Sequence, residues 1–282
     1  MLATKPVPTS PTAAPAPDYE KWNQRLNASW SCADYARIGV TLQLTGEELA
    51  EAVDYIPGSR VLDVAAGNGN ASLALARRFC NVVSTDYVQP LLDKGRARAQ
   101  AEDLDIDFQI ADAQNLPFAD GEFDGVVSTF GVMFAPDQPA SASELIRVCR
   151  PGGKIALASW TPKSFVGRMC ATIGSHMSAA PGFKAPANWG REEFINQHFG
   201  PAASDLSIEW KTYNFRYRSP FHYLDFFRSY YGLCRKAYEK VGPEGEQALT
   251  ADILALVDEF NISTDGSVTM PSDYAQVVMT KA

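Results

Sequence analysis

Short apolar runs alternate with helix-like segments through the middle of the chain. Five of these runs are rich in β-branched residues and almost wholly apolar, which is typical of strands buried on both faces of a sheet. They are Arg60–Val64, Val82–Asp86, Asp107–Asp112, Phe123–Thr129 and Lys154–Ser159. The segments between them predict helices at Ser72–Phe79, Gln89–Ala101 and Ala140–Cys149. Alternation of this kind builds right-handed βαβ units around a parallel sheet.

After Trp160 the pattern changes. It predicts helices at Ser164–Ala180, around His222–Tyr231 and at Glu244–Phe260, a loop at Pro181–Trp189, and strands at Ile208–Tyr217 and Tyr274–Thr280. We therefore expect an α/β fold. It is a Rossmann-like, doubly wound, mostly parallel sheet of seven strands that closes with one antiparallel strand and carries an added helical cap. Ligands of such sheets bind outside the carboxyl ends of the strands, near the switch point.

Four segments follow from this pattern. Residues 1–17 are rich in proline and predict a disordered tail. Residues 18–59 predict an N-terminal helical segment that covers the ligand site. Residues 60–160 form the ligand-binding core, and residues 161–282 supply cap helices and the final strands of the sheet.

Composition narrows the classes of partner. Lysine and arginine number 25 against 33 aspartate and glutamate residues, a net charge of −8 that is poorly suited to nucleic-acid phosphates. The five cysteines form no C-x-x-C pair, so we expect reduced thiols and no metal site. No apolar run approaches the length of a membrane span and no secretory signal is visible, so we expect a cytoplasmic protein. The oligomeric state, a homodimer included, stays open.

The first candidate site follows the first predicted strand. Gly67 and Gly69 allow a tight turn and close approach to a ligand, and the next helix offers free N–H groups to an anion. A dinucleotide pyrophosphate and the carboxylate of a methionine moiety both qualify. Ser72 departs weakly from the dinucleotide fingerprint. Asp63 would repel a pyrophosphate but suits the cationic amino and sulfonium groups of S-adenosylmethionine.

Three further strand ends carry candidate ligand-binding residues. Asp86 ends the second strand, 19 residues after Gly67, and can accept hydrogen bonds from both ribose hydroxyls. Asp112 follows the third strand, where its carboxylate can accept from an adenine amino group while the N–H of Ala113 reaches a ring nitrogen. The alternative for Asp112 is a helix N-cap. The backbone around Thr129 ends the fourth strand and can line the sulfonium.

Residues 60–160 resemble the catalytic domain of the UbiE-like class I methyltransferases, which are related to the ubiquinone and menaquinone C-methyltransferases. The matching stretches are VLDVAAGNGN, STDY, ADAQNLPFADGEFD, STFGVMFAPD and ELIRVCRPGGKIALASW, with YARIG and FRSYYG as similar flanks. The resemblance implies S-adenosyl-L-methionine as the cofactor. It implies contacts with the methionine part from Asp63, Ala65 and Gly67, with the ribose from Asp86 and Tyr87, with adenine from Asp112 and Ala113, and with the sulfonium from Thr129 and Phe130. Asn68 and Asn70 stand where the family often has threonine.

The sequence thus predicts methyl transfer from S-adenosylmethionine to a small molecule by in-line displacement. Such a reaction needs alignment and exclusion of water more than a catalytic triad. The general base is unassigned, with His222 and Tyr231 as candidates. An apolar or aromatic acceptor is favoured, because many aromatic residues fall outside the core: Tyr35, Phe165, Trp189, Phe221, Tyr223, Phe226, Phe227, Tyr230 and Tyr231.

Three alternatives remain. The chain could be a non-catalytic protein that binds S-adenosylmethionine or S-adenosylhomocysteine, or an NAD-dependent oxidoreductase on a similar fold. Nucleic-acid methylation is disfavoured, because the Asn/Asp-Pro-Pro-Tyr/Phe loop of base amino-methylases is replaced here by Thr129-Phe130-Gly131-Val132.

Overall fold

The computed structural model describes residues 17–177, 182 and 184–282. The predicted disordered tail therefore lies outside the described residues, apart from Pro17. The end of the predicted helix Ser164–Ala180 and the start of the predicted loop Pro181–Trp189 fall outside them as well.

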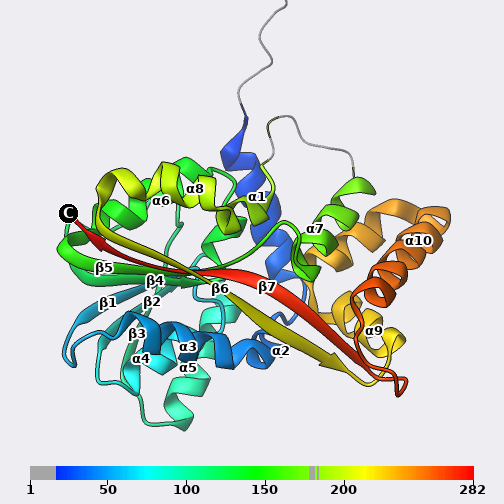
Figure 1. The fold of residues 1–282 in the computed structure, drawn as a ribbon, viewed down its shortest axis with the longest axis horizontal. Coiled ribbons are helices and arrows are strands. Elements are labelled where there is room, and N and C mark those ends of the chain that lie inside the picture. The colour runs from blue at the N-terminus through cyan, green and yellow to red at the C-terminus, as the bar shows by residue number, and fades with distance from the viewer. Residues whose placement is uncertain (1–16, 178–181, 183) are drawn as a thin grey trace, which may run out of the picture.

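A seven-stranded sheet runs through the molecule in the order β3-β2-β1-β4-β5-β7-β6 (Figure 1). The first five strands are parallel, and β7 is antiparallel to both β5 and β6. This arrangement confirms the predicted α/β fold with one antiparallel strand. The strands are β1 (Arg60–Val64), β2 (Asn81–Asp86), β3 (Ile106–Ile110), β4 (Phe123–Thr129), β5 (Cys149–Trp160), β6 (Ala203–Tyr217) and β7 (Val268–Lys281).

Helices cover both faces of the sheet. In Figure 1, α3, α4 and α5 lie below it, α6 and α8 lie above it, and α7, α9 and α10 gather at one end as the added helical part. The α-helices are α1 (Tyr19–Ser31), α2 (Ala36–Gly39), α3 (Gln43–Val53), α4 (Asn70–Ala76), α5 (Gln89–Ala101), α6 (Gln138–Val148), α7 (Phe165–Ser175), α8 (Glu192–His198), α9 (Pro220–Tyr230) and α10 (Gly232–Phe260). Short 3-10 turns are η1 (Val40–Leu42), η2 (Val132–Phe134), η3 (Pro186–Gly190) and η4 (Gly200–Ala202).

Side-chain caps explain where several helices begin. Asp137 accepts a hydrogen bond from the Ala140 N–H at the start of α6, and Ser164 accepts one from the Gly167 N–H at the start of α7. Each cap satisfies an N–H that has no partner inside the helix.

Several predicted boundaries were wrong. β5 begins at Cys149, before the predicted start at Lys154, and includes Pro151-Gly152-Gly153; its pairing with β4 shifts register there. A β-bulge accommodates the extra residues, so the strand continues past them. β6 and β7 are also longer than expected. α10 has non-helical backbone at Gly242 (φ 71°), before Pro243, so it consists of two helices joined at a kink. The second agrees with the predicted helix Glu244–Phe260, and the first, from Gly232, was not predicted.

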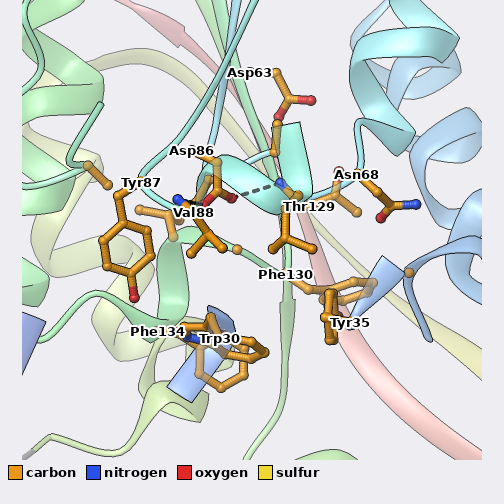
Figure 2. A pocket seen from close by; sticks show the side chains of 18 of the residues that line it. Trp30, Tyr35, Asp63, Asn68, Asp86, Tyr87, Val88, Thr129, Phe130 and Phe134 are labelled. Carbon is orange, nitrogen blue, oxygen red and sulfur yellow. Dashed lines mark hydrogen bonds between the residues drawn. The ribbon is translucent and has the colours of Figure 1, made fainter. Parts of the chain in front are cut away.

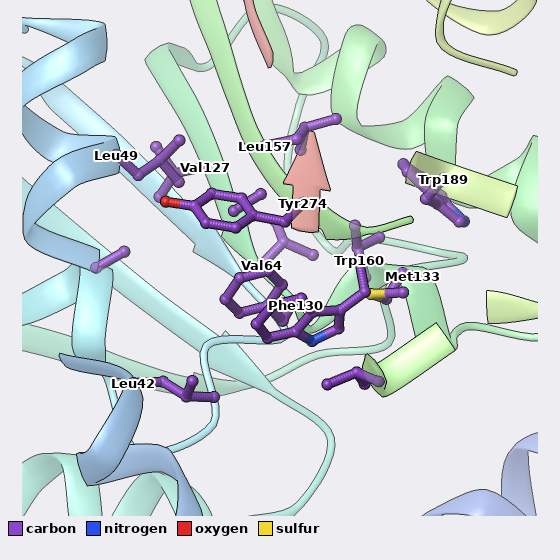
Figure 3. Close-up of a cluster of buried hydrophobic side chains, with 14 of the residues drawn as sticks. Leu42, Leu49, Val64, Val127, Phe130, Met133, Leu157, Trp160, Trp189 and Tyr274 are labelled. Atoms are coloured by element: carbon purple, nitrogen blue, oxygen red, sulfur yellow. The ribbon is translucent and has the colours of Figure 1, made fainter. Parts of the chain in front are cut away.

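An aromatic cluster lies where β4 and β5 end, beside β7 (Figure 3). The ring of Phe130, directly after β4, stacks on Trp160 with centroids 3.9 Å apart and planes 4° apart, and Tyr274 meets the Phe130 ring edge-on at 5.4 Å. All three side chains are buried. Because the ring of Phe130 is held in the core, the backbone at the end of β4 is held in place.

Candidate functional site

One pocket opens at the carboxyl ends of β1 to β4 (Figure 2). The strand order places the switch point between β1 and β4, where doubly wound sheets bind their ligands. All nine residues predicted to bind the cofactor line this pocket: Asp63, Ala65, Gly67, Asp86, Tyr87, Asp112, Ala113, Thr129 and Phe130. Their individual contacts with a cofactor stay predictions.

The loop after β1 turns sharply under the pocket. Ala65, Gly67 and Gly69 all have positive φ, at 53°, 58° and 80°. Such values are strained for alanine and easy for glycine. A Cβ built on Gly67 would meet no protein atom within 4 Å, so the backbone of Gly67 faces open space. This surface suits a ligand that must approach the main chain closely.

The Asp86 carboxylate is held by two backbone N–H groups. Its Oδ2 accepts from the Gly67 N–H at 2.9 Å, and its Oδ1 accepts from the Val88 N–H at 2.9 Å. Each carboxylate oxygen can accept a further hydrogen bond. Burial raises the pKa of Asp86 to about 6, and these hydrogen bonds oppose the rise. The geometry leaves Asp86 able to accept from a vicinal diol.

Asp63 carries an unsatisfied oxygen. Its carboxylate is 1% exposed; Oδ2 accepts from the Ser72 hydroxyl at 2.6 Å, whereas Oδ1 has no hydrogen-bond partner. Burial raises the pKa of Asp63 to about 7, and the Ser72 hydrogen bonds oppose the rise. A buried carboxylate oxygen without a partner is costly unless a ligand supplies one, and a cationic amine would do so. Ser72, which departs weakly from the dinucleotide fingerprint, thus has a role, because its hydroxyl orients the Asp63 carboxylate.

The stability of the unliganded protein should depend on the Asp63 titration. An unfolded aspartate has a pKa of about 3.9, so between about pH 4 and 7 the folded chain binds more protons than the unfolded chain. The free energy of unfolding should therefore fall as the pH rises through this range. Asp86, with a pKa of about 6, acts in the same direction. Urea denaturation at several pH values should give a flatter curve for Asp63→Asn than for the unmodified protein, and equal slopes would contradict the assignment.

Helix α1 closes the pocket at the Asp112 end. The Asn23 side-chain amide donates to the Asp112 carboxylate at 2.5 Å, and that of Asn27 donates to the Tyr87 carbonyl at 2.7 Å. Asp112 also accepts from the Gln114 N–H at 3.0 Å, which closes a local turn. The residues between β3 and β4 are all described and contain no helix, so the alternative interpretation of Asp112 as a helix N-cap was wrong.

Aromatic rings form a further wall of the pocket. Trp30 from α1 meets Tyr35 edge-on at 5.2 Å and Phe134 edge-on at 5.0 Å, and all three residues line the pocket. In Figure 2 these rings lie across the pocket from Asp86. Thr129, also in the lining, has a buried hydroxyl without a hydrogen-bond partner. This side of the pocket is therefore apolar apart from the Thr129 hydroxyl.

Sequence reasoning missed Asn23, Trp30 and Phe134 as lining residues. Asn23 and Trp30 lie in the segment 18–59, but α1 has no motif that separates Asn23 from its neighbours. Phe134 lies within the family-like stretch STFGVMFAPD, so its position after β4 was a usable signal.

The two candidates for a general base lie outside the described pocket lining. The ring of His222 accepts a hydrogen bond from the Arg218 N–H at 3.2 Å, at the start of α9. Tyr231 is buried behind Trp30, with ring centroids 5.6 Å apart, and burial raises its pKa well above the usual value. Neither side chain lines the pocket, and a role for either as the general base stays a prediction.

The nine aromatic residues that the sequence places outside the core have different surroundings. Tyr35 lines the pocket, whereas Phe165 and Tyr223 are fully buried and Phe221 is 64% exposed.

Among the described residues, no helix combines the length and apolarity needed to cross a membrane.

Comparisons with known sequences identify a methyltransferase domain in this chain. A family model described as "Methyltransferase domain" matches residues 62–157. An uncharacterized protein of Mycobacterium tuberculosis is 41% identical over 232 residues, which cover 80% of this chain and 83% of that protein. A demethylmenaquinone methyltransferase of Renibacterium salmoninarum is 39% identical over 117 residues, 42% of this chain and 48% of that enzyme.

Solved structures give the same fold. A Bacillus halodurans protein assigned as a methyltransferase has a TM-score of 0.58 at 20% identity, covering 84% of this chain and 98% of its own. The [4+2]-cyclase SpnF has a TM-score of 0.53 at 17% identity, covering 85% of this chain and 81% of its own. At these identities the likeness concerns the fold.

Proposed function

This chain belongs to the UbiE-like class I S-adenosylmethionine-dependent methyltransferases, and we propose that it transfers the methyl group to a small-molecule acceptor by in-line displacement. One observation carries the proposal. The ends of four neighbouring strands bring the nine predicted residues into a single pocket that contains an unsatisfied, buried carboxylate oxygen on Asp63.

The polar groups of the pocket fit the parts of S-adenosylmethionine. In this proposal the free Oδ1 of Asp63 accepts from the amino group, and Asp86 accepts from the ribose hydroxyls through its remaining lone pairs. Asp112 and Ala113 hold the adenine edge under α1. The open face of Gly67 gives the methionine part room against the backbone.

S-adenosylmethionine supplies a methyl carbon that is already activated by the sulfonium. The protein then needs to align an acceptor with that carbon and keep water away. Trp30, Tyr35 and Phe134 supply an apolar wall beside the Thr129 hydroxyl, which supports an apolar or aromatic acceptor.

The free state of all five cysteines supports a reducing, cytoplasmic location.

Two alternative functions, NAD-dependent oxidation and another use of the same pocket, are compared with methyl transfer. A carboxylate on Asp63 beneath the glycine turn opposes a pyrophosphate, which disfavours an NAD-dependent oxidoreductase. The fold is shared with a [4+2]-cyclase, so fold likeness does not decide between methyl transfer and another use of the pocket. A direct assay is therefore needed.

Calorimetry and a transfer assay together test the function. We expect binding of S-adenosylmethionine and S-adenosylhomocysteine and none of NAD. We then expect S-adenosylhomocysteine to form in a small-molecule extract, with a methyl gain in one acceptor. NAD binding in place of S-adenosylmethionine would overturn the proposal. Tight binding without consumption of the methyl donor would favour the non-catalytic alternative.

Filling the open space over Gly67 should block the cofactor. A Gly67→Val side chain would project where no protein atom lies within 4 Å, at a residue with positive φ. We expect the affinity for S-adenosylhomocysteine to fall below detection in calorimetry. Gly58→Val provides the control, because Gly58 also has positive φ and open space around its Cβ position but does not line the pocket. Equal losses in both variants would show a general folding defect.

A further inference from the structure

We propose that the methyl acceptor is an amine, whose nitrogen arrives as a neutral lone pair and leaves as an N-methylammonium held against the rings of Trp30, Tyr35 and Phe134. This inference rests on the proposed function and names the chemical class of its acceptor. It follows from the charge of the pocket, from the placement of the rings, and from the groups available to move a proton.

The charge of the pocket opposes an anionic acceptor. Its described lining contains three carboxylates, Asp63, Asp86 and Asp112, and no lysine, arginine or histidine. A carboxylate or phosphate on the acceptor would therefore meet like charges and no cationic side chain of this lining. A cation, by contrast, would be stabilised by the same field.

The aromatic wall is suited to a cation. Trp30 stands edge-on to both Tyr35 and Phe134, with centroids 5.2 and 5.0 Å away, so the plane of the Trp30 ring is steeply inclined to the planes of the other two rings. Aromatic faces attract ammonium groups, tryptophan most strongly, and groups of such rings recognise methylated ammonium ions. Burial raises the pKa of Tyr35, so its hydroxyl stays neutral and Tyr35 acts through its ring and as a hydrogen-bond donor.

Helix α1 places this wall away from the adenine end. Trp30 follows Asn23 by seven residues, about two helical turns or roughly 10 Å along the axis. Asn23 is fixed to Asp112, which holds the adenine edge in the proposed function. The rings therefore lie toward the other end of the adenosine, on the side of Thr129 and Phe130 after β4.

The absence of a dedicated base favours a nucleophile that needs none. In the described lining, the ionisable groups are the three carboxylates, Tyr35 and Tyr87. Asp86 is bound to two N–H groups and Asp63 to Ser72, and both are assigned to the cofactor. An ammonium ion and a phenol can each lose a proton to water before they enter, but the phenol then arrives as an anion among carboxylates, whereas the amine arrives as a neutral nucleophile.

The step balances without a further reactant. The amine lone pair forms the new N–C bond as the C–S bond breaks, and the C–S electron pair stays on sulfur. The positive charge thus passes from sulfur to nitrogen, toward the aromatic wall. Where the amine carried an N–H, the product ammonium releases that proton to water after it leaves the site.

A matched pair of probes tests the cation preference. Choline and 3,3-dimethylbutan-1-ol have the same shape and hydroxyl, and differ in the positive charge. With the protein saturated with S-adenosylhomocysteine, we expect choline to bind at least about tenfold more tightly. Equal affinity, or tighter binding of the neutral alcohol, would overturn the proposal. Because S-adenosylhomocysteine binding is measured first, failure of the proposed function is seen separately.

Variants locate the preference in the wall. Phe134→Leu and Tyr35→Leu should each reduce the choline preference several-fold while S-adenosylhomocysteine still binds, and Tyr35→Phe should restore most of it. Phe221→Leu is the control, because Phe221 is 64% exposed and lies outside the described lining. An undiminished preference in both leucine variants would place the cation elsewhere and overturn the assignment.

Turnover of three acceptors that each carry one benzene ring then distinguishes methylation of an amine, a phenol and a carboxylate. Methylation of N-methylbenzylamine in preference to 4-methylphenol and phenylacetate would support the proposal. Methylation of the phenol or the carboxylate in preference to the amine would overturn it and leave the methyltransferase function intact.

Discussion

In the Asp86→Asn variant, we expect the affinity for S-adenosylmethionine and S-adenosylhomocysteine to fall by about tenfold to a hundredfold. The buried Asp86 carboxylate already accepts from the Gly67 and Val88 N–H groups, and its remaining lone pairs are the proposed acceptors of the ribose hydroxyls. A hydrogen bond to a charged group contributes about 1.5–3 kcal/mol, and each 1.4 kcal/mol is a tenfold change in affinity. The asparagine amide also turns an NH₂ toward one of the two backbone N–H groups.

Calorimetry with a third ligand assigns the loss to the ribose. 5′-Deoxy-5′-methylthioadenosine keeps the ribose and lacks the amino acid, so its affinity should fall by a similar factor. Asp93→Asn is the matched control, because the Asp93 side chain is 57% exposed and lies outside the described lining. If Asp86→Asn binds methylthioadenosine as tightly as the unmodified protein, Asp86 does not hold the ribose.

The parallel core of the fold was predictable because its strands are buried on both faces. Val61, Leu62 and Val126 are all fully buried, so burial appears in the sequence as short, continuous apolar runs. The pocket was predictable for a related reason. Ligand-binding residues of this fold follow strand ends, and Asp63 and Asp86 could be placed there once the strands were recognised.

The part of the pocket supplied by α1 was not predictable in the same way. Asn23 reaches Asp112 across 89 residues of sequence, and this contact depends on how α1 lies against the core. Nor does composition separate a lining aromatic from a buried one. Tyr35 lines the pocket and Tyr223 is fully buried, although both lie in aromatic-rich segments outside the core. That difference is set by tertiary packing, which the aromatic composition of a segment does not reveal.

The loops after β1 and β4 are in close contact at Gly131 and Ala65. A Cβ on Gly131 would overlap the carbonyl oxygen of Ala65 and would lie 2.8 Å from the Ala65 Cβ. Ala65 and Phe130 already have strained positive φ values of 53° and 58°, and the ring of Phe130 is stacked on Trp160 in the core. Neither loop can therefore move away easily.

We expect Gly131→Ala to destabilise the protein by about 3 kcal/mol or more, and to abolish S-adenosylhomocysteine binding where the protein still folds. The matched control is Gly174→Ala in α7, where a Cβ would meet no atom within 4 Å. There, alanine should stabilise the helix by up to about 1 kcal/mol. Thermal unfolding of both variants with and without ligand tests the pair. If Gly131→Ala unfolds at the same temperature as the unmodified protein and binds normally, the two loops can separate, and their contact does not shape the cofactor site.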